Sequence, residues 1–450
     1  MSRQTVGATI LAYGRESALY RWATARSEGF VSIHLGGARF LPESLLAAVA
    51  SSTLLAPIIE TRRSSDILMV ALIASLPLGS YEVALFSLPD VLLLLTSGVL
   101  GLQALRRRRL RVTAASLGTI AATTGLLLWM SVSIALTNAS PLSLTQPIGH
   151  WLLLVVIVLY VDDTSDVHRI LSAAAVAAVG VAFLTLLGAV VQLPTEPRTI
   201  PPRTFGPVTM PVGRVRGVPL AFGILGMFLL YPAPYLAVRG WRDRSLGALG
   251  GVGGIVLAVG ITQSRSTYLA LAAAIGVLAV TGIGWIIAFG APRWRRRVGI
   301  ASVLGGIASI PVALVGARIL IAAGRVNFVR RLRQIRQGLS TLLARPLFGT
   351  GPDQFQSSTG AENVIHAAPI RLGAESGLPT LVAFLAAVYL GVRQLVRTAF
   401  TSRHRSLAVV VAAGAAAVAV EAVFQSSFGR PTWVVLALAV TAPWSDDVTH

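Results

Sequence analysis

The sequence predicts an all-α fold, a polytopic bundle of about twelve transmembrane helices with a long external loop that carries an amphipathic helix. Composition is the first reason: 54% of the 450 residues are hydrophobic and only 12% are charged, whereas a soluble domain usually carries about 25% charged residues. The mean hydropathy of +0.73 agrees with this. Apolar runs of about 20 residues, the length needed to cross a hydrocarbon core of about 30 Å, recur from Asp66 to the C-terminus.

The first 65 residues are predicted to form a cytoplasmic or interfacial segment, and residues 66–450 a single membrane domain. Met1 to Phe40 is mixed in polarity and carries several arginines, so we expect no cleaved signal peptide there. Leu41 to Ile59 is nearly long enough to span, but its prolines and alternating small residues fit a helix at the interface about as well. The interface is favoured because a span there would place the basic N-terminus outside.

The predicted spans follow one another with short polar breaks. In chain order they are 66–81, 88–105, 112–136, 149–161, 170–192, 218–238, 246–262, 267–289, 299–320, 378–391, 407–424 and 432–444.

Arginine clusters give the predicted topology. The runs at 106–111, 239–244, 293–297 and 393–405 all follow even-numbered spans, and the positive-inside rule makes that side cytoplasmic. Both termini of this multi-pass protein of the plasma (inner) membrane then face the cytoplasm, and odd-to-even connections face outward. The formal charge of +20 is therefore attributed to topology and to attraction by anionic lipid, and we expect no nucleic-acid partner.

The sequence has no cysteine, which excludes disulfides, thiolate catalysis and metal sites built on thiolates. Two tight acidic clusters, Asp162-Asp163 with Asp166 and Asp446-Asp447, fall on the predicted cytoplasmic side. We expect both to be solvated helix ends.

Two predicted external connections are long, at about 193–217 and 321–377, and loops beyond about 15 residues are usually functional or carry their own structure. The second contains a helix-like stretch from Asn327 to Ala344 with arginines between its apolar residues. The apolar positions near helical spacing are Val329, Leu332, Ile335, Leu339 and Leu342. This pattern predicts an amphipathic helix on the outer leaflet.

Several arginines lie on the side that the positive-inside rule disfavours. The loop at 321–377 holds seven arginines against three acids. Arg214 and Arg216 precede the sixth predicted span, and Arg265 lies in the tight connection between the seventh and eighth. Guanidinium groups from three connections can converge on one phosphate group, and a phosphate-bearing lipid is the natural ligand. The alternative is that these side chains only snorkel to lipid headgroups.

Of six histidines, His150 and His366 map to the outside. A neutral imidazole can accept a proton from an attacking hydroxyl, which suits a general base. His366 is the stronger candidate because Arg371 and Glu375 follow it closely, in the segment that enters the tenth predicted span. A surface or core role is the alternative for either ring.

A set of motifs resembles the O-antigen ligase and polymerase family of membrane glycosyltransferases. In order they are Arg214-Val215-Arg216-Gly217 with Pro219, Thr262-Gln263-Ser264-Arg265-Ser266, Arg345-Pro346-Leu347-Phe348-Gly349-Thr350-Gly351-Pro352, His366, and Glu375-Ser376-Gly377-Leu378-Pro379. The resemblance runs from about Arg214 to Pro379. It departs at Ala367, where the family has asparagine, and at Ile335, where it has tryptophan.

The resemblance implies transfer of a glycan from a polyprenyl pyrophosphate carrier to an acceptor hydroxyl, on a glycan, lipid or protein, at the outer membrane face. Such an enzyme serves polysaccharide or lipopolysaccharide biosynthesis in the cell envelope and works among membrane lipids. Arginines would neutralise the departing pyrophosphate, so neither a metal nor another cofactor is expected.

The resemblance also implies roles for individual residues. Arg265 and Arg214 would contact the pyrophosphate, with Arg216 as the alternative to Arg214 and Arg331 as a weaker third contact. His366 would be the catalytic base, and Glu375 would orient it or cap the tenth span. The supporting positions are Arg371 and the backbone-shaping glycines Gly349, Gly351 and Gly377.

The sequence is also compatible with other functions. A ligase and a repeat-unit polymerase of the same family cannot be separated by sequence. A lipid-linked glycan transporter or flippase also needs many helices and basic residues, and Glu421 is the one charge within a predicted span that keeps transport open as a function. A nonenzymatic assembly subunit is a further possibility.

Overall fold

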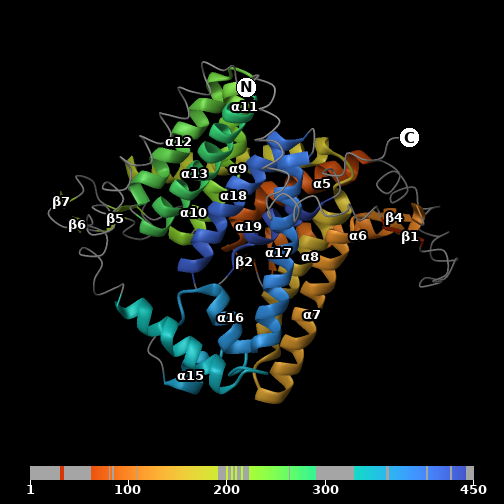
Figure 1. Cartoon of the computed structure of the whole chain (residues 1–450), viewed down its shortest axis with the longest axis vertical. Coiled ribbons are helices and arrows are strands. Elements are labelled where there is room, and N and C mark those ends of the chain that lie inside the picture. Colours follow the sequence, from red (N-terminus) through yellow and green to blue (C-terminus); the bar gives the residue numbers. More distant parts are fainter. Residues whose placement is uncertain are drawn as a thin grey trace, which may run out of the picture.

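The computed structural model describes residues 31–34, 62–80, 82–83, 86–107, 109–190, 199–200, 204–205, 208–209, 214–215, 222–262, 264–289, 329–360, 364–401, 404–425 and 428–441. Within these ranges the fold is a bundle of α-helices (Figure 1). Extended residues there form only short antiparallel pairs. These are β1 (Val31–His34) with β4 (Arg109–Val112), β2 (Glu82–Val83) with β3 (Phe86–Ser87), β5 (Thr199–Ile200) with β8 (Arg214–Val215), and β6 (Thr204–Phe205) with β7 (Val208–Thr209). The predicted helical fold class is confirmed.

The first half of the bundle follows the predicted spans closely. Its helices are α5 (Arg62–Ser75, followed by the 3-10 turn η2, Leu76–Ser80), α6 (Leu88–Arg107), α7 (Ala114–Thr137), η3 (Pro141–Leu144) with α8 (Thr145–Tyr160), and α9 (Thr164–Val190). Side-chain hydrogen bonds cap the N-termini of α7 and α9. Thr113 Oγ1 accepts the Ser116 N–H at 3.0 Å, and Asp163 Oδ1 accepts the Ser165 N–H at 2.7 Å. Such caps satisfy N–H groups that the first helical turn leaves unpaired.

The second half contains α10 (Phe222–Leu230), α11 (Ala233–Arg242), α12 (Leu246–Thr262), α13 (Arg265–Phe289), α17 (Leu378–Thr401), α18 (Arg405–Phe424) and α19 (Arg430–Val440). The predicted sixth span was wrong as a single helix. It is broken at Tyr231 and Pro232, because proline lacks the N–H that would continue the ladder. Gly414 of α18 accommodates the break, since a Cβ there would overlap the Tyr231 carbonyl oxygen.

Six described helical segments are long and apolar enough to cross a membrane: Ala114–Thr137, Pro141–Tyr160, Thr164–Gly188, Arg265–Gly282, Leu378–Ala399 and Arg405–Phe424. The helices Leu88–Ala104, Leu246–Thr262 and Arg430–Val440 are apolar but shorter. The chain is therefore an integral membrane protein. The predicted span 299–320 and the segment 41–59 lie outside the described residues, as does Asp446-Asp447, and the total of about twelve spans stays a prediction.

A group of elements from the predicted external loop lies at one end of the bundle, opposite the end where α11 lies (Figure 1). It comprises a helix over residues 329–344, drawn in cyan, with α15 (Phe355–Thr359) and α16 (Ala368–Ser376). These elements share a small hydrophobic core, which is formed by Phe355, Ile365, Ala367 and Ala374. Ile335 packs against this core. This core fixes the loop elements to one another, apart from the main core of the bundle.

The predicted amphipathic helix is present, but its apolar row is divided between two surroundings. Leu342 is buried and Ile335 partly buried against the protein, whereas Val329, Leu332 and Leu339 are exposed. The face turned to the protein also carries polar residues, including the buried Gln334 and half-buried Arg331. Part of the apolar row therefore packs on the protein, and the position of this helix on the outer leaflet stays a prediction.

Candidate functional site

The turn at 345–351 is joined by backbone hydrogen bonds to the end of α16. Gly351 N–H donates to the Glu375 carbonyl at 2.8 Å, and Leu378 N–H donates to the Pro346 carbonyl at 2.7 Å. Two motifs that lie about 25 residues apart in the sequence are therefore one structural unit, held by bonds that require no particular side chain.

Glycines make this contact possible. Gly349 and Gly377 have φ of 64° and 87°, in the left-handed region that favours glycine, and Gly351 has 99°. A Cβ on Gly377 would overlap the Leu347 carbonyl, and one on Gly349 would lie 2.5 Å from the Ala374 carbonyl oxygen. Both backbones approach too closely for any side chain.

Helix α7 holds the same turn from the other side. Trp129 Nε1–H donates to the Leu347 carbonyl at 2.8 Å, and the Ser133 hydroxyl donates to the Phe348 carbonyl at 2.7 Å. The Trp129 and Phe348 rings stack with centroids 5.4 Å apart. A pocket of about 300 Å³ lies between the end of α7 and residues 345–349. The turn is thus anchored to a membrane-spanning helix.

Glu375 stabilises the turn through its side chain. Its carboxylate accepts Arg371 Nε–H at 2.9 Å and the Asp353 N–H at 3.2 Å, and Arg371 also pairs with the Asp353 carboxylate at 2.6 Å. Burial raises the pKa of Glu375 above its ordinary value, with Arg371 opposing the shift. The described bonds of Glu375 are to Arg371 and Asp353, and its roles toward His366 and the start of α17 stay predictions.

His366 precedes α16 and is held between the buried residues Ile365 and Ala367, which belong to the small core. Gly338 brings the 329–344 helix close, since a Cβ there would lie 2.7 Å from Ile365 Cδ1. Burial lowers the pKa of His366 below its ordinary value, and the positive charges of Arg331, Arg330 and Arg371 lower it further. The ring is therefore neutral at pH 7 and able to accept a proton.

Arg331 links this histidine to the membrane helices. Its guanidinium lies 5.4 Å from the centroid of the Phe424 ring at the end of α18 and donates to the Phe424 carbonyl at 3.4 Å. Burial lowers the pKa of Arg331, Arg265 adds to the shift, and Glu421 opposes it. Arg331 thus lies within electrostatic reach of both Arg265 and Glu421.

Arg265 is the first residue of α13, and the turn before it is ordered by its own hydroxyls. Ser264 Oγ and Ser266 Oγ are 3.1 Å apart, and Tyr268 OH donates to the Gly260 carbonyl of α12 at 2.8 Å. The connection is short, and Ser264 is buried. Arg265 therefore begins its helix at a rigid corner of the bundle.

Glu421 is the site residue that the sequence reading did not assign. Its side chain is 0% exposed, near the C-terminal end of α18. The available signal was a single acid in an apolar span, which is a functional-site indication by default. We refer to Arg265, Arg331, His366 and Glu421 together as the arginine site.

The described contacts do not assign Arg214 or His150 to this group. Arg214 is on β8, and Arg216 is outside the described residues. His150 is buried in α8 with its ring stacked on Trp433, centroids 5.6 Å apart, so its contacts are those of a core residue. In the described part of the chain, no group of three or more histidine, aspartate or glutamate side chains is placed to hold a metal ion.

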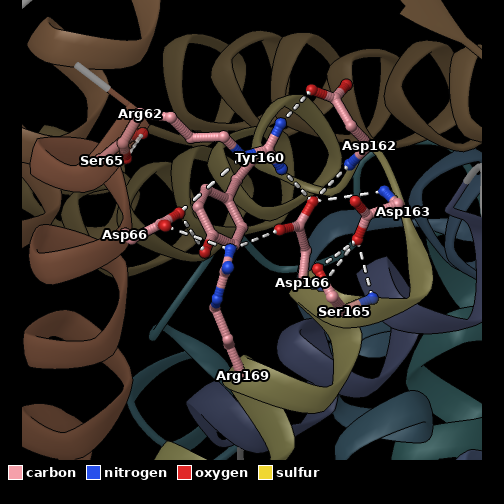
Figure 2. Close-up of polar contacts among 9 residues, drawn as sticks. All are labelled: Arg62, Ser65, Asp66, Tyr160, Asp162, Asp163, Ser165, Asp166 and Arg169. Atoms are coloured by element: carbon pink, nitrogen blue, oxygen red, sulfur yellow. Dashed lines mark hydrogen bonds and ion pairs between the residues drawn. The ribbon is translucent and has the colours of Figure 1, made fainter.

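A second charged cluster joins α5, the end of α8 and the start of α9 (Figure 2). We call it the aspartate cluster; its members are Arg62, Asp66, Tyr160, Asp162, Asp163, Asp166 and Arg169. Asp166 is 0% exposed and pairs with Arg62 and, at 3.0 Å, with Arg169. It also accepts the backbone N–H groups of Asp162 and Asp163 at 2.9 and 3.2 Å. The expectation of a solvated helix end was wrong for Asp166, because two arginines pair with it inside the protein.

Residues 250–385 match the family model described as O-antigen ligase. No curated protein sequence matches the chain. The matched stretch includes Arg265, Arg331, the 345–351 turn, His366 and Glu375. The match supports an O-antigen ligase-like family for this membrane protein.

Proposed function

We propose that the chain is a membrane glycosyltransferase that moves a glycan from a polyprenyl pyrophosphate carrier to an acceptor hydroxyl on the outer face of the membrane. The observation that supports the proposal is that Arg331 lies within electrostatic reach of both Arg265 and His366, although the three residues come from separate segments. All three lie within the stretch that matches the O-antigen ligase family.

His366 would act as the base. As the acceptor oxygen attacks the anomeric carbon of the donor sugar, its proton passes to the neutral imidazole. The new carbon–oxygen bond forms while the bond from that carbon to the pyrophosphate oxygen breaks, and the electron pair leaves with the pyrophosphate. The three arginines near His366 support this role because they disfavour its protonated form.

Arg265 and Arg331 would bind the pyrophosphate and neutralise the charge that develops as it departs, so the proposed reaction needs no metal or other cofactor. Arg214, or Arg216 in its place, would be a further contact. Arg371 and Glu375 would act indirectly, by holding the turn that precedes His366 in the chain. The acceptor would approach from outside, with both termini in the cytoplasm.

The test is a transfer assay with the purified full chain in lipid bilayers, a polyprenyl pyrophosphate-linked glycan and a panel of acceptors. We expect transfer by the wild type, none above background by His366→Ala or Arg265→Ala, and normal transfer by the control His404→Ala, which changes a histidine at the start of α18. Transfer by both site variants at the wild-type rate would contradict the proposal.

The same assay separates the related functions. A ladder of products that grows by repeat units indicates a polymerase, and a single added glycan on a lipid or protein indicates a ligase. Movement of intact lipid-linked glycan between leaflets, without transfer to any acceptor, would replace the proposal with a flippase.

A further inference from the structure

Glu421 presents a buried carboxylate that lies among hydroxyl groups and close to the charge of Arg331. It lies in α18, which packs along α13, and its side chain is 0% exposed. Gln425 donates to Oε2 at 3.4 Å, and the hydroxyls of Ser266 and Thr267 on α13 lie beside the carboxylate. Burying a charged carboxylate costs free energy, so a nearby positive charge or a ligand is needed to stabilise it.

Gly226 of α10 packs directly against Glu421 Oε1. A Cβ on Gly226 of α10 would overlap Glu421 Oε1 and lie 2.5 Å from Thr267 Oγ1. Thr267 is buried on α13, and its hydroxyl faces the same carboxylate. Three helices, α10, α13 and α18, therefore converge on this carboxylate.

The positive charges that face Glu421 are those of the arginine site. Glu421 stabilises the charged form of Arg331, while Arg265 destabilises it. The two guanidinium groups thus repel one another, and the carboxylate between α13 and the end of α18 is the charge that offsets this repulsion. Arg331 approaches along Phe424, three residues beyond Glu421 in the same helix.

We propose that Glu421 is a resident anion of the arginine site, which holds Arg265 and Arg331 in place while the site is empty and competes with the pyrophosphate once it is bound. This rests on the proposed function. Glu421 does not contact the reacting atoms and is a positioning residue. Its charge keeps the arginines from binding the departing polyprenyl pyrophosphate too tightly, so that the product is released.

The proposal predicts opposite changes in affinity and turnover. Replacing the carboxylate by a neutral amide removes the repulsion between Glu421 and the pyrophosphate, so binding tightens, and slower release of the product lowers kcat. A residue that only supports packing would not tighten binding when it is changed.

The experiment compares wild type with Glu421→Gln in the full chain in lipid nanodiscs. Binding of polyprenyl pyrophosphate without a glycan is measured directly, and KM and kcat are measured with the glycan donor. We expect Glu421→Gln to lower the Kd and KM about tenfold and to lower kcat by a similar factor, an effect on the scale of one charge pair in a partly buried site. Glu421→Asp shortens the side chain by one methylene and so moves the charge away from the arginines. It is expected to change Kd, KM and kcat in the same directions by about two- to threefold.

The double variant Glu421→Gln with Arg331→Gln provides the control for mechanism, because the tighter binding is expected to disappear once Arg331 is neutral. If Glu421→Gln does not fold, Glu421→Asp carries the test. Unchanged or weaker binding in the folded variants overturns this inference. Failure of the wild type to bind polyprenyl pyrophosphate at all would instead overturn the proposed function.

Discussion

The aspartate cluster and the arginine site are both built from arginines and carboxylates, but they differ in the sign of the charge that is in excess. In the aspartate cluster four aspartates surround two arginines, and the described contacts of Asp166 engage both carboxylate oxygens (Figure 2). In the arginine site the guanidinium groups of Arg265 and Arg331 are offset by the single carboxylate of Glu421, so positive charge is in excess.

The difference separates a structural cluster from a ligand site. A cluster whose buried carboxylate is bonded through both oxygens joins helices and has little capacity left at that carboxylate. A cluster with excess positive charge has its capacity left for an anion. Counting charges in three dimensions therefore distinguishes the two, although both contain the same residue types.

The largest expected effect concerns His366. His366→Gln keeps a polar side chain but removes the group that accepts the proton, so transfer should fall by roughly 10²–10⁴-fold, the usual contribution of general base catalysis. Initial rates at saturating donor would measure it, with His404→Gln as the matched control. A loss of less than about threefold would remove His366 from the chemistry.

The next effect tests whether the arginine site acts on the reaction and not on the fold. Arg331→Gln should lower kcat/KM by about 10²–10³-fold, in line with the loss of one preorganised charge-stabilising donor. Some loss of stability is expected as well, because Arg331 offsets the buried Glu421 carboxylate, so the rates are compared per folded molecule. Arg333→Gln, on the exposed side of the same helix, is the control. A large drop in stability for Arg331→Gln, with normal activity per folded molecule, would reverse the assignment.

The aspartate cluster should respond in the opposite way. Arg62→Met removes one partner of buried Asp166, while Arg169 and two backbone N–H groups remain. We therefore expect a loss of about 1–3 kcal/mol of stability, less than for a fully stripped charge. Activity per folded molecule should be unchanged. Unfolding in detergent would be compared with Arg63→Met, a change at the exposed neighbouring arginine.

The smallest effect is on pH dependence. Arg330 helps to hold the pKa of His366 below its ordinary value, after the larger contributions of burial and Arg331. Activity should be lost as pH falls through this pKa, because the base becomes protonated. Arg330→Gln should raise the pKa and move the acidic limb of the pH–rate profile to higher pH, while Arg336→Gln leaves it in place. A shift to lower pH would contradict the proximity of Arg330 to His366.

Much of the fold was predictable because it depends on local properties of the chain. Apolar runs of spanning length gave most of the described helices, and the glycines of the 345–351 turn and Gly377 mark where the backbone takes positive φ. The single sixth span was wrong because hydropathy is insensitive to the missing N–H of Pro232. The orientation of the 329–344 helix was predicted only in part, because helical spacing cannot tell a face that packs on protein from one that meets lipid.

The sequence by itself determined that this is a helical membrane protein and that a histidine follows a glycine-rich turn, and it predicts which arginines lie on the disfavoured side. Only the tertiary structure decided which of these charges meet. Arg331 and Arg265 are 66 positions apart and Glu421 lies farther along, so their proximity is a product of helix packing. The same packing buries Asp166 between two arginines and leaves the arginine site with excess positive charge, because charge balance belongs to a volume of space and not to a stretch of chain.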